Sequence, residues 1–206
     1  MKKTLFTLLS LISFSANSAL FQGTGSASFN NPAGPAGFIS TGSGTSQFTW
    51  GNANLGTPPS SLDYTGKQFD IDENDAFVFG TIDYFNGSIG DSTGATSVDL
   101  NVGLNFTSPL TNGEKFEFNL GLINTPNTAN ANDSADIVNF DNTVPSNFFS
   151  SNGTDFTLEF LGFGTLTGSG FTIEDSFRVL ESGSATVDLV GRITSTPVPV
   201  PGALWL

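Results

Sequence analysis

The chain has 206 residues, of which 37% are hydrophobic and 12% charged, and it contains no Cys and no His. The absence of these two residue types excludes disulfides, Cys- or His-based metal sites, and the Ser-His-Asp and Cys-His catalytic arrangements. Six Lys and Arg against 19 Asp and Glu give a net charge of -13. This charge excludes nucleic acid as a partner, because phosphate binding needs clustered basic side chains.

Residues 1–19 have the pattern of a secretory signal peptide. Lys2 and Lys3 form a basic start, an apolar stretch runs from Thr4 to Phe14, and a run of small residues follows. A short buried helix is the alternative interpretation, but small residues follow the stretch and it is too short to span a bilayer. We therefore expect export through the Sec machinery.

Removal of the signal peptide makes the protein more acidic. Cleavage is expected after Ser18 or after Ala19, and the sequence leaves both positions open. The mature chain would keep four basic residues against 19 acidic ones, a net charge of -15. Such a charge opposes binding to anionic lipid and favours divalent cations.

Residues 20–44 are rich in Gly, Ser, Ala and Pro, and this composition predicts a loosely structured lead-in. The main domain is expected at 45–194. No repeat of fixed period is present in it, so a solenoid or an array of repeats is not expected.

Alternating apolar and polar residues, the period of a half-buried strand, dominate the main domain. The pattern is clearest from Val98 to Phe106, and it returns from Phe116 to Leu122 after a turn at Thr111-Asn112-Gly113. These two segments therefore predict a hairpin. The other predicted strands are Gln47–Trp50, Ala76–Phe85, Ile137–Phe140, Phe156–Phe160, Gly170–Glu174, Phe177–Leu180 and Val187–Leu189.

About nine short strands, with no amphipathic helix of three turns after the signal peptide, predict an all-β fold. Because the strands have one polar face, we expect an antiparallel β-sandwich, jelly-roll-like in arrangement. A closed β-barrel is the alternative. The 21 Phe residues should supply much of the core.

The densest acidic segment runs from Asp70 to Asp75 and begins with D-x-D-x-N, the spacing of oxygen ligands in a calcium loop. Its candidate calcium ligands are Asp70, Asp72, Asn74 and Asp75. The segment departs from an EF-hand, because Asp75 stands where the loop needs Gly and Thr81 stands at the position of the bidentate Glu. A solvated acidic turn is the ordinary alternative.

A second carboxylate group comprises Asp133, Asp136 and Asp141, in an Asn-rich loop before a predicted strand. Asp136 is expected to form structural hydrogen bonds, with calcium binding as the alternative. Glu159 and Glu174 are candidates for the paired carboxylates of a glycosidase, but Glu159 occupies an outward position in its strand. We therefore predict no catalytic residues and no enzymatic activity.

Four short segments are spread along the main domain: Phe48–Gly51, Phe79–Gly87, Asn124–Thr128 and Ala135–Val138. They resemble motifs of the choice-of-anchor K domains, and the resemblance spans roughly residues 45–193. The resemblance implies an extracellular module that precedes a surface-anchoring signal, and it supplies no catalytic residue.

Residues 195–206 form a Pro-rich linker that turns apolar at its end, with Pro at every second position from 197 to 201. The motif V-P-V-P-G-A-L-W-L resembles the opening of the PEP-CTERM sorting signal of Gram-negative bacteria, which continues into a transmembrane helix and a basic cluster. The helix and cluster are missing here, so we expect a truncated signal. The matching residues are Val198, Pro199, Pro201, Gly202, Ala203, Trp205 and Leu206.

The resemblance implies processing by an exosortase during export to the cell surface or the exopolysaccharide matrix. With the signal peptide, it predicts an exported, non-enzymatic surface or extracellular-matrix protein of a Gram-negative bacterium. The alternative is a calcium-assisted carbohydrate-binding module for exopolysaccharide. No cofactor is expected apart from calcium at the acidic segment.

Overall fold

The computed structural model describes residues 19–53, 56–109, 113–128, 130, 132–140, 146–151, 153–167 and 170–195. The predicted signal peptide up to residue 18 and the sorting-motif residues from Val198 to Leu206 lie outside these ranges, as does Asp141. Within these ranges, every regular element is a β-strand. No helix in the described part of the chain is long and apolar enough to cross a membrane.

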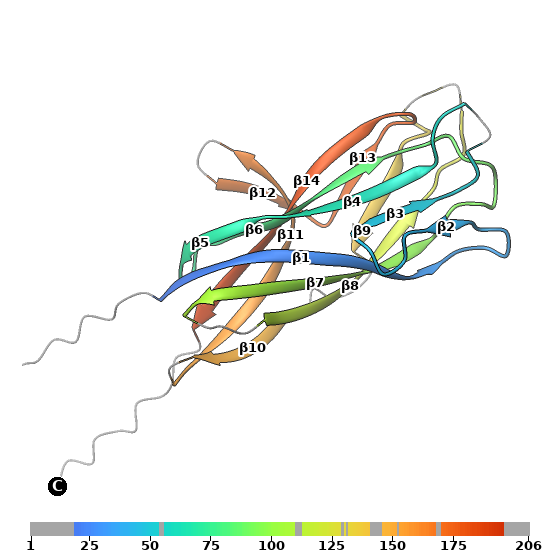
Figure 1. Ribbon diagram of the computed structural model, residues 1–206. Helices are drawn as coiled ribbons and strands as arrows, with labels where there is room; N and C mark the ends of the chain where they lie inside the picture. The colour runs from blue at the N-terminus through green and yellow to red at the C-terminus, as the bar shows by residue number, and fades with distance from the viewer. Residues whose placement is uncertain are drawn as a thin grey trace, which may run out of the picture.

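The strands form two antiparallel sheets that pack face to face (Figure 1). Sheet A has the order β13 (Ser176–Val179), β9 (Asp136–Phe140), β8 (Gly113–Ile123), β7 (Ser97–Ser108), β1 (Leu20–Ala33), β5 (Gln68–Asp72). Sheet B has the order β10 (Ser146–Ser151), β11 (Thr154–Thr167), β14 (Ser184–Ser195), β6 (Ala76–Phe85), β4 (Ser60–Gly66), β3 (Gln47–Trp50), β2 (Ser40–Thr41). A further strand, β12 (Gly170–Glu174), pairs with β11.

The antiparallel β-sandwich expected from the sequence is therefore confirmed. All nine predicted segments form or overlap strands, and the expected hairpin is the β7–β8 pair, in which Leu100 lies opposite Phe118. The described residues contain 14 strands rather than about nine. The additional ones are β1, β2, β4, β5 and β10.

The prediction of a lead-in at 20–44 is wrong for its first part, because β1 lies inside sheet A between β7 and β5. Its inward positions run from Phe21 through Gly23, Gly25 and Ala27 to Phe29. Gly23, Gly25 and Ala27 are too small for the sequence to show the alternation of apolar and polar residues that predicts a strand. Rings from neighbouring strands occupy the space instead, and a Cβ on Gly23 would lie 2.6 Å from the Phe69 ring.

The two sheets are joined where the chain passes from β4 in sheet B to β5 in sheet A. At this junction the Gly25 N–H donates to the Lys67 carbonyl (2.9 Å), and the Lys67 N–H donates to the Phe79 carbonyl (3.0 Å). The buried Tyr64 hydroxyl also donates to the Phe79 carbonyl, at 3.0 Å. These bonds connect β1 to β6 through a single residue, so the two sheets are in direct contact here.

Aromatic rings fill much of the space between the sheets. Phe21 is fully buried and meets Phe106, Phe149 and Phe156 edge-on, with centroid distances of 6.1, 6.1 and 5.1 Å. Edge-to-face packing of this kind adds stability beyond the burial of area. The Phe-rich core therefore belongs to both sheets at once.

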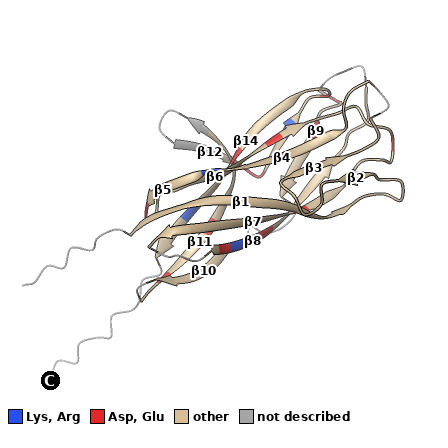
Figure 2. Ribbon diagram, viewed as in Figure 1, with Lys and Arg blue, Asp and Glu red and all other residues tan. Residues whose placement is uncertain are grey.

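Charged residues are sparse along the described part of the ribbon (Figure 2). The four basic residues of the domain lie on separate segments: Lys67 between β4 and β5, Lys115 on β8, Arg178 on β13 and Arg192 on β14. The described residues thus gather no basic patch.

Candidate functional site

The acidic segment predicted to bind calcium lies at the end of β5 and in the turn to β6. Asp70 and Asp72 are exposed and lie on one face of β5, and the Asp70 carboxylate accepts a bond from Gln22 Nε2 at 3.0 Å. The Asp75 N–H donates to the Asp72 carbonyl at 3.2 Å, and Asn74 adopts a φ of 73°. The described residues contain no group of three Asp, Glu, His or Cys that could hold a metal ion. Calcium at this turn stays a prediction.

The same turn connects the two ends of the described chain. The Glu73 N–H donates to the Ala19 carbonyl (3.1 Å), and the Glu73 carboxylate accepts from the Ser195 N–H (2.9 Å). The Asn74 N–H donates to the Ile193 carbonyl at 2.8 Å. The start of β1 and the end of β14 are therefore held together at this end of the sandwich, and Glu73 is the residue that joins them.

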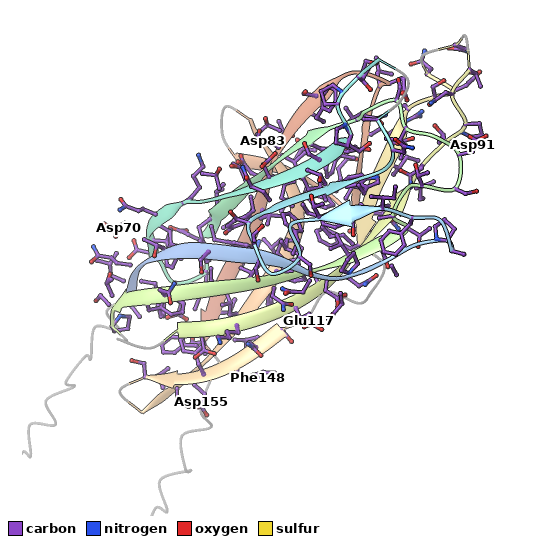
Figure 3. All side chains as sticks on the ribbon, turned by 45° about the vertical axis from the view of Figure 1, so that its right-hand side comes forward. Asp70, Asp83, Asp91, Glu117, Phe148 and Asp155 are labelled. Atoms are coloured by element: carbon purple, nitrogen blue, oxygen red, sulfur yellow. The ribbon has the colours of Figure 1, made fainter. Side chains whose placement is uncertain are left out.

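The opposite end contains a cavity of about 540 Å³, the end pocket, formed by the loops before β7 and after β8. Its lining includes Ile89, Asp91, Leu122, Asn124, Thr125 and Asp136. Figure 3 shows Asp70 and Asp91 at opposite ends of the molecule. The end pocket therefore lies far from the acidic turn.

Asp136 is the buried carboxylate of the end pocket, with only 4% of its surface exposed. Its Oδ1 accepts bonds from the Thr125 N–H (2.7 Å) and the Thr125 hydroxyl (3.2 Å), and its Oδ2 accepts from the Tyr84 hydroxyl (3.4 Å). The structure thus shows the hydrogen bonding expected of Asp136. Its predicted companion Asp133 is exposed and accepts from Asn130 Nδ2 at 2.9 Å.

Burial raises the pKa of Asp136 to about 6, because desolvation penalises the charged carboxylate more than the Thr125 bonds favour it. The nearby negative charge of Glu181 raises it further. Burial also raises the pKa of Tyr84 well above its ordinary value, and the charges of Asp136 and Glu181 act in the same direction. Asp136 of the end pocket and Glu181 therefore act together on the buried Tyr84 hydroxyl.

An aromatic stack holds Asn124 of the end-pocket lining in place. The Trp50 ring stacks on Tyr84 with centroids 5.7 Å apart, and Trp50 Nε1 donates to Asn124 Oδ1 at 3.1 Å. Asn124 Nδ2 in turn donates to the Ala95 carbonyl at 2.6 Å. The pocket wall is thus connected to the core of both sheets.

These contacts bring together the four segments that resemble choice-of-anchor motifs. Trp50, Tyr84, Asn124 and Asp136 each come from a different one of them, and they meet through the stack and bonds just described. Sequence reasoning did not select Tyr84, Asn124 or Thr125 as site residues. Their positions within those segments are the sequence feature that could have identified them.

The outer face of sheet A has a shallow groove of about 550 Å³. Two rows of paired residues cross β1, β7 and β8 there: Ser26, Gly103 and Lys115 in the first, Ser28, Asn101 and Glu117 in the second. Glu117 is labelled in Figure 3. Since Gly103 has no side chain, the first row is hollow in its centre. The groove offers hydroxyl, amide, ammonium and carboxylate groups, the set that hydrogen-bonds sugar hydroxyls.

The two glutamates considered for glycoside hydrolysis lie on different strands of sheet B. Glu159 on β11 pairs with Arg192 on β14, and Glu174 on β12 pairs with Phe163. In the described strand pairs the two glutamates are not partners of each other, so this arrangement supports no assignment of an acid and base pair.

Comparison of the chain with models of known protein families gives no match, and no curated protein matches it significantly.

Proposed function

We propose that this chain is an exported, non-enzymatic protein of the cell surface or extracellular matrix of a Gram-negative bacterium, sorted through an exosortase-type signal. The sequence support is the signal-peptide pattern of residues 1–19 and the sorting-motif resemblance from Val198 to Leu206. The two sorting segments flank one β-sandwich.

The observation that carries the proposal is the meeting of both described ends at Glu73, at the end of the sandwich opposite the end pocket. If a C-terminal segment attached the protein to the envelope, Ser195 and its end of the sandwich would lie next to the membrane. The end pocket and its loops would then point away from the membrane, which suits a displayed module.

The proposal is tested by following the whole chain in a Gram-negative host that has an exosortase and in a strain that lacks it. We expect a mature protein starting at Ala19 or Leu20 in the envelope or medium, identified by mass spectrometry. Its matched control replaces Leu8 and Leu9 in the apolar stretch by Arg, which should keep the protein uncleaved inside the cell. Retention of the unaltered chain inside the cell would contradict the proposal.

The groove on sheet A favours a second function, binding of exopolysaccharide. Asn101 Oδ1 is buried without a hydrogen-bond partner among the described residues, and a sugar hydroxyl would supply the missing donor. Asn101→Ala should weaken binding to purified exopolysaccharide about tenfold, the effect of one hydrogen bond of about 1.4 kcal/mol. Asn105→Ala, on the same strand but outside the groove lining, is the control. No binding by the unaltered protein, with and without calcium, would remove this function.

A further inference from the structure

Two buried oxygen atoms lack hydrogen-bond partners among the described residues and lie on segments next to the β13–β9 pair: Asn86 Oδ1 and Glu181 Oε1. The Asn86 side chain is completely buried. Because an unpaired buried oxygen costs free energy, such an atom needs an explanation, and a bound water or a bound ion is the usual one.

Asn86 is fixed against the turn that contains Glu181. The Asn86 N–H donates to the Gly183 carbonyl at 2.9 Å, and its carbonyl accepts from the Ser182 N–H at 2.8 Å. The side-chain Nδ2 donates to the Val179 carbonyl at 2.9 Å, so the amide cannot turn over without losing this bond. The unpaired Oδ1 is therefore held in one orientation.

This orientation places Asn86 beside Asp136. Val179, which accepts from Asn86, is the cross-strand partner of Asp136 in the β13–β9 pair. Tyr84 lies two residues before Asn86, on the same inward face, and its hydroxyl reaches Asp136 from sheet B. Asn86 from sheet B and Asp136 from sheet A thus both lie next to Val179, and Glu181 belongs to the turn that binds the Asn86 backbone.

Among the described residues, the region around Asn86 and Asp136 has two carboxylates, those of Asp136 and Glu181, and no basic side chain paired with either. Glu181 is close enough to Asp136 and Tyr84 to affect the protonation of both. Among the described residues, no Lys or Arg acts on Asp136, and the neighbouring Arg178 donates to the Asn132 carbonyl at 2.7 Å instead. Two carboxylates and an amide oxygen without a cation match the oxygen-only ligand set of calcium.

We propose that Asn86 Oδ1 and the carboxylates of Asp136 and Glu181 bind one calcium ion at this end of the sandwich. This site is distinct from the predicted one at Asp70 to Asp75, and it does not depend on the proposed function. Calcium takes six to eight oxygen ligands, so water from the end pocket would complete the shell. With three protein side chains, the affinity should fall in the range of extracellular modules, a Kd of about 0.1 to 1 mM.

The experiment measures calcium binding to the whole secreted protein by calorimetry and by the shift in thermal unfolding. Terbium luminescence gives a second readout, since Trp50 stacks on Tyr84, whose hydroxyl contacts Asp136. Energy transfer from these rings would excite a terbium ion at the proposed site. We expect calcium to stabilise the protein and to displace terbium with a Kd of about 0.1 to 1 mM.

Glu181→Gln removes one ligand charge from a turn residue and should weaken calcium binding at least tenfold. Asn86→Asp adds a charge at the unpaired oxygen and should restore a measurable affinity when combined with Glu181→Gln. The matched control is the double variant Asp70→Asn and Asp72→Asn, which removes two charges at the opposite end and should leave the affinity and the luminescence unchanged.

Three results would overturn the proposal. The first is no calcium binding at concentrations up to about 10 mM, tenfold above the weakest extracellular sites, which would indicate a buried water only. The second is unaltered binding by Glu181→Gln. The third is loss of binding in the Asp70 and Asp72 double variant, which would assign calcium to the β5 turn.

Discussion

The contact between the two sheets at Gly25 allows a sharp test of the fold. A Cβ built on Gly25 would lie 1.9 Å from the Phe79 carbonyl oxygen and 2.8 Å from the Tyr64 hydroxyl. Real Cβ atoms do not come within 3.0 Å of such atoms. Gly25→Ala must therefore move β1 away from β6 by about 1 Å, a shift that core packing resists.

The expected cost follows from what this movement breaks. The two hydrogen bonds through Lys67 each contribute about 1 kcal/mol, and overpacking of a tight site costs about 1 to 3 kcal/mol. Replacing Gly also stabilises by about 0.4 to 1 kcal/mol through the unfolded chain. We expect Gly25→Ala to lower the free energy of unfolding by about 3 kcal/mol.

Urea unfolding followed by tryptophan fluorescence, in which the buried Trp50 reports on the core, measures this loss. With a slope of about 2 kcal/mol per molar urea, the midpoint should fall by about 1.5 M. Gly103→Ala on β7 is the matched control, because its Cβ would meet only the Ser26 hydroxyl, at 3.0 Å, and that side chain can rotate. We expect this variant to stay within about 1 kcal/mol of the unaltered protein. Equal midpoints for the two variants would refute the close approach of the sheets.

Three further predictions concern single side chains. Phe149 is 8% exposed and Phe148 is 75% exposed. In urea unfolding, Phe149→Ala should therefore lower the free energy of unfolding by about 3 to 5 kcal/mol, and Phe148→Ala by about 0.5 kcal/mol or less. Equal losses would contradict the register of β10. Glu73→Ala should speed hydrogen exchange at the Ser195 amide and cost about 1 to 3 kcal/mol, and unchanged exchange would show that Glu73 does not hold the chain end. Burial raises the pKa of Asp188 and the charge of Lys67 lowers it, so Lys67→Met should raise that pKa further in an NMR titration. Because the folded pKa of Asp188 lies above its unfolded value, its contribution to the free energy of unfolding is lost as pH rises above 3.8 and through the folded pKa. An unchanged Asp188 pKa in Lys67→Met would show that the Lys67 charge does not act on Asp188.

The sequence pattern identified candidate site residues where acidic residues are close together in the chain. It could not identify residues that only the fold brings together. Asp70 and Asp72 stand out because they are close in the chain, yet the structure shows them exposed on an outer strand. Glu181 and Asn86 carry no such signal, since 95 positions separate them in the sequence. Only the pairing of Asn86 with the 180–183 turn brings them together, and that pairing depends on which strands neighbour each other.

The sequence by itself determined the class of fold, because the period-two alternation of strands such as β6 and β7 depends only on which face of each strand is buried. It also contained the signal-peptide pattern and the sorting-motif resemblance, which are linear signals. Tertiary structure decided the place of β1, because Gly23 and Gly25 leave room for residues that are distant in the chain, such as Phe69 and Phe79. It likewise decided the end pocket, where Trp50, Tyr84, Asn124 and Asp136 meet, since long-range pairing of strands has no local signature.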